Sequence, residues 1–159
     1  MKSKIRIFGH PAHQAFVVIP AGLLIGSAGF DAFALIASTP ASYHLTAHHM
    51  LAAGLVTGLM AAPVGTLDWL SIPSGTRAKR IGMFHACANV LALLVFGTSW
   101  FLRRNAPESP SLVAVGLSFF ALGSLSLAAW FGGELVSRLG VGVSDDANLN
   151  ATSSLSDHA

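Results

Sequence analysis

The sequence predicts an all-α fold, an integral membrane four-helix transmembrane bundle, from its composition and from the length of its apolar stretches. Of the 159 residues, 53% are hydrophobic and only 10% are charged, whereas soluble domains carry about 25% charged residues. Four apolar stretches are each long enough to cross the hydrocarbon core of a bilayer, which takes roughly 20 helical residues. Because backbone groups in lipid must be satisfied within the protein, we interpret these stretches as helices.

The helices are expected at residues 14–38, 47–72, 80–102 and 112–137. Residues that start or end helices separate them, namely Thr39 and Pro40, then Thr46 as a cap of the second helix, then residues 73–75 and residues 105–110. Residues 1–143 are therefore predicted to form one transmembrane domain. Residues 144–159, rich in Asp, Asn and Ser, are predicted to be a disordered tail.

The basic residues indicate an orientation in the membrane. Four crossings place both termini and the loop between the second and third helices on one side. The other side carries only Arg103 and Arg104. Since basic loops stay in the cytoplasm, both termini are predicted to be on the cytoplasmic side. The first apolar run is too long for a signal peptide and is expected to be retained. Seven Lys and Arg residues lie on the predicted cytoplasmic side: Lys2, Lys4, Arg6, Arg77, Lys79, Arg80 and Arg138.

Every predicted helix brings at least one ionisable residue to its cytoplasmic half. Intramembrane ionisable residues usually face the bundle interior and find partners, so we expect them to form one cluster. The five residues are His10, His13, Asp68, His85 and Glu134.

Three interpretations of this cluster are open. The five residues could be ligands of a metal ion, since imidazole and carboxylate groups suit iron, manganese or zinc. His13 and His85 could instead hold haem b between two helices. In the third interpretation Asp68 and Glu134 pair with a histidine or with Arg80, and form a structural lock without a cofactor.

The outer half of the predicted bundle contains a second set of polar residues. Asp31 lies inside the first helix, where we expect an ordinary hydrogen-bonded carboxylate near Thr98, Ser99 and Ser118. His44 and His48 are four residues apart and share a helical face if the second helix starts early. They could bind a metal ion or lie solvated at the interface, and the role of these two and of His49 is left open.

Several functions are excluded or disfavoured by what the sequence lacks. Cys87 is the only cysteine, which excludes an internal disulfide, a thiolate zinc cluster and the attachment motif of a c-type haem. The sequence has no phosphate-binding glycine loop, nucleophile elbow or paired-histidine protease motif, so we do not expect an enzyme that acts by itself. The formal charge of +2 is too small and dispersed for a nucleic-acid binder.

A series of short motifs runs along the chain: Gly9, His10, Pro11 and His13, then Pro20 and Gly22, Phe30 and Asp31, Asp68 and Trp69, His85, Trp130, Gly132 to Val136, and Gly140 to Val143. These motifs resemble a bacterial family of four-helix membrane domains, catalogued as the domain of unknown function 2231 family. The resemblance covers residues 8–143 and implies a bacterial inner-membrane protein. In some relatives the domain is joined to a Rieske-type iron–sulfur domain, which suits a membrane redox module. Relatives often have an aromatic residue in place of Ser137 and a histidine in place of Leu139, so no site is carried over beyond Glu134.

The sequence therefore predicts a multi-pass protein of the bacterial inner membrane that contacts lipid and binds haem b or a non-haem metal ion for electron transfer. Any redox partner, such as an iron–sulfur protein, would be a separate chain, because the sequence lacks the Rieske cysteine pattern. A homo-oligomer is compatible with these features. The alternative is a structural or accessory membrane protein whose His, Asp and Glu residues form a buried polar lock.

Overall fold

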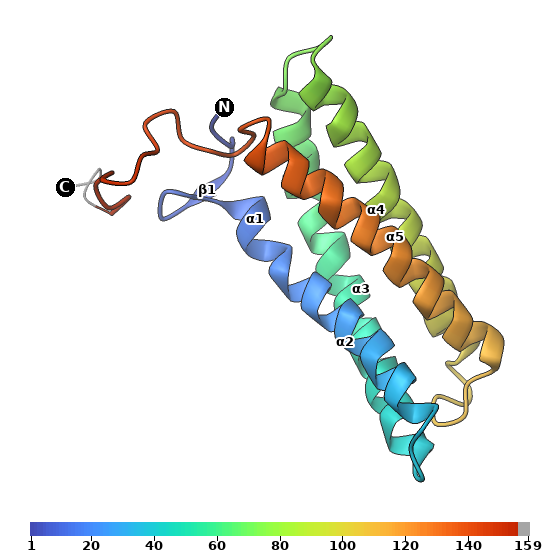
Figure 1. The fold of residues 1–159 in the computed structure, drawn as a ribbon. Helices are drawn as coiled ribbons and strands as arrows, with labels where there is room; N and C mark the ends of the chain where they lie inside the picture. Colours follow the sequence, from blue (N-terminus) through green and yellow to red (C-terminus); the bar gives the residue numbers. More distant parts are fainter. Residues whose placement is uncertain (156–159) are drawn as a thin grey trace.

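The computed structural model describes residues 1–155 and consists of four long helices that lie side by side (Figure 1). The N-terminus, the described residues after α5 and the loop between the second and third long helices lie at one end, here called the terminal end, and the other two loops lie at the distal end. The fold class predicted from the sequence is confirmed, since four helices are long and apolar enough to cross a membrane. The elements are β1 Arg6–Ile7, β2 His10–Pro11, α1 Ala12–Phe16, α2 Val18–Ala34, α3 Pro40–Ser71, α4 Arg77–Leu102 and α5 Leu112–Ser137.

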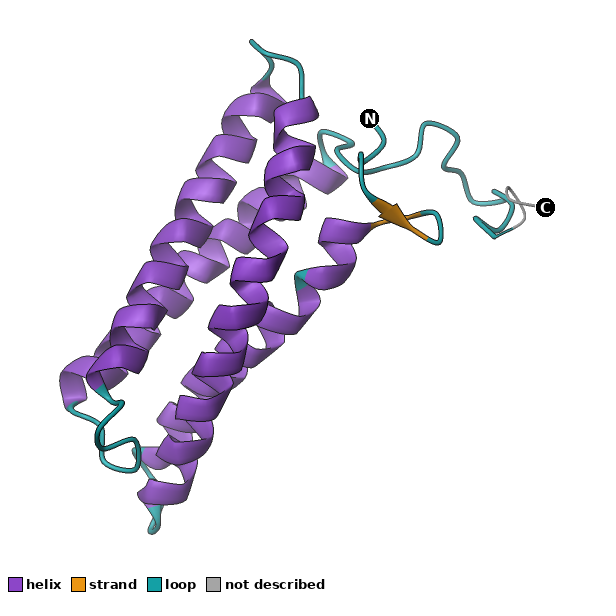
Figure 2. Cartoon of the chain, turned by 180° about the vertical axis from the view of Figure 1, so that it is seen from behind, coloured by secondary structure: helices purple, strands orange, loops and turns teal. Residues whose placement is uncertain are grey.

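The bundle is built from two helical hairpins, α2–α3 and α4–α5 (Figure 2). Helices within each hairpin pack along most of their length, while the contacts between the hairpins are less extensive. All four long helices contribute to one core, whose buried residues are Leu24, Leu51, Ala92, Phe96 and Ala121. Small residues allow this close packing: a Cβ on Gly54 would lie only 2.8 Å from the Leu24 side chain.

The first predicted helix is divided into α1 and α2 at Val17. The backbone stays helical there, with φ −64° and ψ −20°, and the amide of Val17 donates to the carbonyl of His13 at 3.0 Å. Pro20 lies in the first turn of α2, where its lack of an N–H removes the bond that would otherwise reach the carbonyl of Phe16. α1 therefore continues the direction of α2, and it carries His13 against Ala61 and Gly65 of α3.

The structure corrects the predicted start of the second transmembrane helix. Thr39 and Pro40 do not end a helix but begin α3, with Thr39 at the N-cap and Pro40 in the first turn, a position that suits the fixed φ of proline. Thr46 is not a cap: it lies inside α3, where its Oγ1 donates a hydrogen bond to the carbonyl of Ser42 at 2.9 Å. At 32 residues and 1.5 Å per residue, α3 is about 48 Å long.

The residues after α5 fold back onto the N-terminal segment. The Met1 ammonium group donates to the carbonyl of Gly140 at 3.1 Å, and the amide of Gly142 donates to the carbonyl of Met1 at 2.9 Å. Further along, Ser154 Oγ donates to the carbonyl of Phe8 at 3.0 Å. Residues 144–155 otherwise form turns without helix or strand, and the remainder of the predicted tail, residues 156–159, lies outside the described residues.

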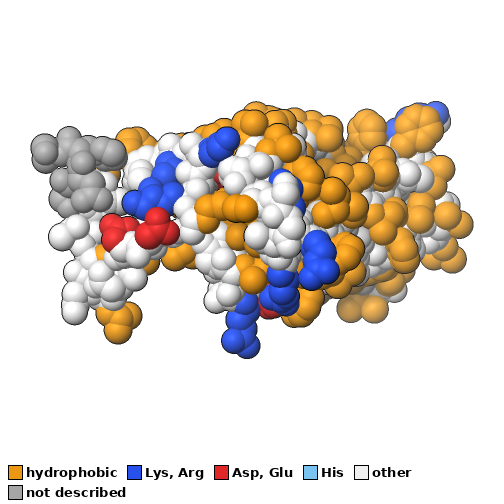
Figure 3. Space-filling model, turned by 90° about the horizontal axis from the view of Figure 1, so that it is seen from above, with side chains coloured by type: hydrophobic (Ala, Val, Ile, Leu, Met, Phe, Trp, Pro, Cys, Tyr) orange, Lys and Arg blue, Asp and Glu red, His pale blue; other side chains and the backbone are white. Residues whose placement is uncertain are grey.

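The surface divides into an apolar body and a charged terminal end. Viewed onto that end, Lys and Arg side chains gather around the terminal segments and the start of α4, while hydrophobic side chains cover the sides of the helices (Figure 3). Large apolar residues such as Ile19, Leu59 and Leu94 are more than half exposed. Contiguous apolar surface of this kind marks a membrane-contacting face.

Candidate functional site

Two histidines from different hairpins meet inside the terminal half of the bundle. His13 comes from α1 and His85 from α4, and their ring centroids lie 6.4 Å apart with the ring planes nearly perpendicular, at 89°. Both side chains are partly buried. We call these two residues the histidine pair.

Each imidazole of the pair is held by a backbone carbonyl on a neighbouring helix. His13 Nδ1 lies 3.3 Å from the oxygen of Ala61 in α3, and His85 Nδ1 lies 2.8 Å from the oxygen of Ala128 in α5. A carbonyl oxygen only accepts, so each Nδ1 must carry the proton and donate it. In the neutral imidazole this assignment leaves the Nε2 lone pair available, which is the usual arrangement of a metal-binding histidine.

Glycines make room for both rings. A Cβ on Gly65 of α3 would lie 2.6 Å from Cε1 of His13, and a Cβ on Gly132 of α5 would lie 3.2 Å from Cε1 of His85. The first distance is shorter than any real Cβ contact, so a larger residue at Gly65 would force the His13 ring to move. The pair therefore fits a space that the absence of two side chains creates.

Asn89 is one turn after His85, and its side chain contacts Nε2, the second nitrogen of the His85 ring. Asn89 Nδ2 lies 3.2 Å from His85 Nε2 and also donates to the carbonyl of His85 at 2.9 Å. The sequence places Asn89 on the same helical face as His85 through the four-residue spacing, which is the signal that could have added it to the site.

The other three predicted ligands lie apart from the pair. Both carboxylate oxygens of Asp68 accept a bond from Ser3 Oγ at 2.7 Å, and one also accepts from the backbone amide of Lys4 at 2.9 Å. Glu134 accepts from Arg77 Nη2 at 2.6 Å, and His10 is exposed in β2.

The expectation of one cluster of five residues therefore gives way to a pair of histidines. Asp68 and Glu134 lie near helix ends. There Asp68 binds the N-terminal segment and Glu134 binds the first turn of α4, instead of a histidine. Within residues 1–155, no group of three or more His, Cys, Asp and Glu side chains is close enough to hold a metal ion.

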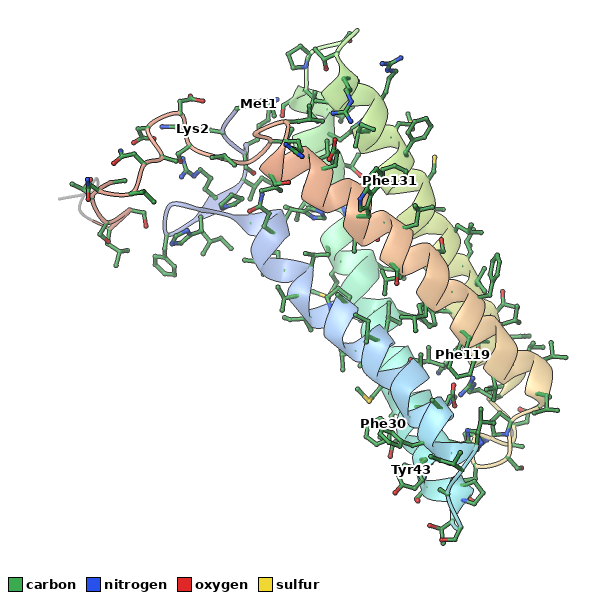
Figure 4. All side chains as sticks on the ribbon, in the orientation of Figure 1. Met1, Lys2, Phe30, Tyr43, Phe119 and Phe131 are labelled. Carbon is green, nitrogen blue, oxygen red and sulfur yellow. The ribbon has the colours of Figure 1, made fainter. Side chains whose placement is uncertain are left out.

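A second polar group lies at the distal end, and four of its five residues are buried. Arg103 Nη1 and Nη2 each donate to one oxygen of Asp31 at 3.0 Å, and both side chains have 0% exposed surface. Arg103 Nη2 also donates to Ser99 Oγ at 2.9 Å and to Ser118 Oγ at 3.1 Å, while His44 Nδ1 lies 3.0 Å from Asp31 Oδ1. We call these five residues, which join all four long helices, the distal cluster. Figure 4 shows polar side chains between the helices at this end, near the labelled Phe30, Tyr43 and Phe119.

Arg103 was predicted to be a loop residue, and its role as the partner of Asp31 was therefore not predicted. Arg103 directly follows α4 and turns back into the bundle because the Asp31 carboxylate needs a cation in low dielectric. Thr98, expected near Asp31, is exposed and donates its Oγ1 to the carbonyl of Leu94 at 2.9 Å. Ser99, which was also expected near Asp31, faces the interior, since adjacent residues on a helix point about 100° apart.

Among the histidines of the early part of α3, His44 has a different partner from His48, whose ring contacts that of His49 with centroids 5.7 Å apart. His44 contacts Asp31, while the ring of His48 stacks on Trp100 with centroids 5.6 Å apart and planes 12° from parallel. His49 is exposed. His44 and His48 thus share a helical face but have different partners.

The four apolar spans, the lipid-facing surface and the buried polar groups define a multi-pass membrane protein. The chain belongs to the family described as "Predicted membrane protein (DUF2231)", whose family model matches residues 9–145. That range contains both the histidine pair and the distal cluster. No curated protein matches the chain, and no solved structure does.

Proposed function

We propose that this protein is a haem-binding electron-transfer module of a bacterial inner membrane, in which His13 and His85 hold the haem iron. The observation that carries the proposal is the histidine pair itself: two imidazoles from separate hairpins, 6.4 Å apart, each with Nδ1 bound to a carbonyl. A bound haem b would supply an iron that takes up and releases one electron, at a potential set by its axial ligands and surroundings.

The number of converging ligands favours haem over a non-haem metal ion. A non-haem ion in a protein takes three or more side-chain ligands, and only two of the five predicted ligands meet. Haem brings its own equatorial nitrogens and needs axial ligands alone. His13 and His85 would be the two residues that hold the haem.

The residues around the pair would orient its two rings and leave their Nε2 atoms able to bind the haem iron. The carbonyls of Ala61 and Ala128 fix the rings, so that both Nε2 atoms carry the lone pair that a metal needs. Asn89 would give up its contact with His85 Nε2 and keep its bond to the His85 carbonyl. The haem would lie between the two hairpins, where fewer helix contacts have to change than within either one.

In this proposal Asp68 and Glu134, the carboxylates of the predicted site, hold neighbouring segments of the protein together. Asp68 fastens residues 3 and 4 to α3, just ahead of the short helix that carries His13. Glu134 ties α5 to the first turn of α4 through Arg77. The alternative function, a structural or accessory protein with a polar lock and no cofactor, is supported by these dedicated partners.

We further propose that the terminal end faces the cytoplasm. Burial of Arg103 in the distal cluster leaves Arg104 as the exposed basic residue of the distal loops. Seven basic residues at the terminal end then oppose one, so the asymmetry that fixes orientation is larger than the sequence count indicates. Electrons would come from or go to a separate partner, such as an iron–sulfur protein, that docks at the membrane surface.

An absorption spectrum tests the proposal directly. We expect protein produced with added haem and purified in detergent to show a Soret band at one haem per chain. His13→Ala and His85→Ala should each abolish it while the bundle stays assembled. His10→Ala is the matched control and should keep full occupancy, because His10 is exposed and outside the pair. A Soret band absent from both native membranes and purified protein would refute haem binding, and metal analysis of the same sample would then test a non-haem ion.

A further inference from the structure

A groove on the outer face of the bundle follows the seam between α4 and α5 in the half next to the terminal end. Phe84 and Phe131 meet across this seam, with ring centroids 5.8 Å apart (Figure 4). The hydroxyl group of Ser124 is already engaged, because its Oγ donates to the carbonyl of Ala88 at 2.9 Å. The groove, of about 320 Å³, therefore offers an apolar lining to a ligand. We call it the α4–α5 groove, and its lining residues are Phe84, Cys87, Ala88, Leu91, Ser124, Leu127 and Phe131.

The α4–α5 groove is open to the hydrocarbon of the membrane. Phe84, Leu91 and Leu127 are 54%, 45% and 51% exposed, so no part of the chain within residues 1–155 covers them. At 26 residues and 1.5 Å per residue, α4 is about 39 Å long, and each end passes the hydrocarbon core of about 30 Å by about three residues. Phe84 and Leu91 lie about 10 and 21 Å from the start of α4. The groove therefore lies in the half of the bilayer next to the terminal end.

Two arginines from opposite sides of the seam lie beyond the groove, toward the membrane surface. Arg80 is one turn before Phe84 and Arg138 is two turns after Phe131, so the helical repeat places each on the side of its helix that lines the groove. Both arginines are exposed. Because Cα–Cβ bonds tilt toward the N-terminus of a helix and α4 and α5 are antiparallel, those of Arg80 and Arg138 tilt toward each other along the bundle.

Neither arginine is neutralised by an acidic residue of the described chain. Within residues 1–155, no ion pair joins Arg80 or Arg138 to a carboxylate. Each acidic residue described at the terminal end has another partner. These partners are Arg77 for Glu134, Ser3 for Asp68, the Met1 ammonium group for Asp145 and Lys2 for Asp146. The two guanidinium groups beyond the groove therefore suit an anion from outside the chain.

We propose that the α4–α5 groove and these two arginines bind one anionic phospholipid, with an acyl chain in the groove and the phosphate between the guanidinium groups. Guanidinium groups bind phosphate oxygens through parallel N–H bonds, and basic pockets between membrane helices bind anionic headgroups. The apolar lining lies in hydrocarbon and the cations lie near the headgroups, which is how chain and charge are arranged in a phospholipid. A free phosphate ion would use the arginines but not the groove. The site does not involve the histidine pair.

Lipid binding to the full chain in detergent tests the charge. We expect native mass spectrometry to show one dioleoylphosphatidylglycerol per chain at concentrations at which dioleoylphosphatidylcholine stays unbound. The double variant Arg80→Ala, Arg138→Ala loses charge-assisted bonds and should weaken phosphatidylglycerol binding about tenfold or more. Both arginines are exposed, so this variant should melt at the wild-type temperature without lipid. The matched control Lys2→Ala, Lys4→Ala removes the same charge from the N-terminal segment and should keep the wild-type affinity.

A further variant tests the groove with both arginines in place. Cys87→Phe adds a ring at an exposed lining position and should lower the affinity for phosphatidylglycerol about tenfold, the contribution of about two buried methylene groups. Ala86→Phe, at the exposed neighbour outside the lining, is the matched control and should leave the affinity unchanged.

Three results would each overturn the proposal. They are equal binding of the two lipids, equal loss in the arginine and lysine double variants, and unchanged affinity in Cys87→Phe. Inorganic phosphate that competes with the lipid at equal concentration would also overturn it, because the arginines would then bind a free anion without the groove.

Discussion

The histidine pair and the distal cluster are both polar groups inside an apolar bundle, but they satisfy their atoms in opposite ways. In the distal cluster every oxygen of Asp31 and both terminal nitrogens of Arg103 are used within the protein. In the histidine pair only one nitrogen of each ring is tied to a carbonyl, and the Nε2 of His85 has a 3.2 Å contact with Asn89 Nδ2 that a ligand could replace. The saturated group is suited to holding helices together, and the unsaturated one to binding a ligand.

The largest effect should come from breaking the saturated group. Arg103→Ala leaves the buried Asp31 carboxylate without its cation, and loss of one member of such a pair costs about 3–5 kcal/mol. We expect a large drop in the free energy of unfolding, measured in detergent with denaturant. Arg104→Ala, at an exposed neighbour, should change it by less than about 0.5 kcal/mol. Equal values for the two variants would remove the distinction between a structural and a functional polar group.

A smaller change in stability is expected at the histidine pair. A substitution there should lower the haem content more than it lowers the stability of the bundle. Gly65→Ala places a Cβ 2.6 Å from the His13 ring, so the ring must leave its position, at a cost of about 1–3 kcal/mol. Haem content per chain should fall sharply, measured by the Soret absorbance against protein concentration. Gly123→Ala, where nothing lies within 4 Å, should keep both haem and stability. Full occupancy in Gly65→Ala would argue that His13 is not a ligand.

The smallest effect distinguishes two adjacent residues of α4. Ser99→Ala removes an acceptor of the buried Arg103 and should cost about 1–2 kcal/mol. Thr98→Ala removes a bond within the exposed helix surface and should cost less than about 0.5 kcal/mol. Both are read from thermal unfolding of the purified variants. The reverse order would mean that α4 is rotated by one residue from the position described.

Part of the candidate site was within reach of the sequence. His13 and His85 could be proposed as a pair because both lie at the same depth in the predicted topology. Asp68 and Glu134 lie at that depth too, so depth alone could not exclude them. Their actual partners are Ser3, in the irregular N-terminal segment, and Arg77, at the first position of α4. The sequence does not show where either residue lies relative to the other helices.

By itself, the sequence determined that the chain has four membrane-spanning helices with both termini at one end of the bundle. Apolar length is a local property, and an even number of crossings returns the chain to its starting side. The tertiary structure alone decided which polar atoms meet: that Arg103 turns inward to Asp31, that Ser99 and not Thr98 faces the core, and that only two of the predicted ligands converge. The rotation of each helix about its axis is set by packing against its neighbours, and a rotation of about 100° per residue is enough to exchange a buried side chain for an exposed one.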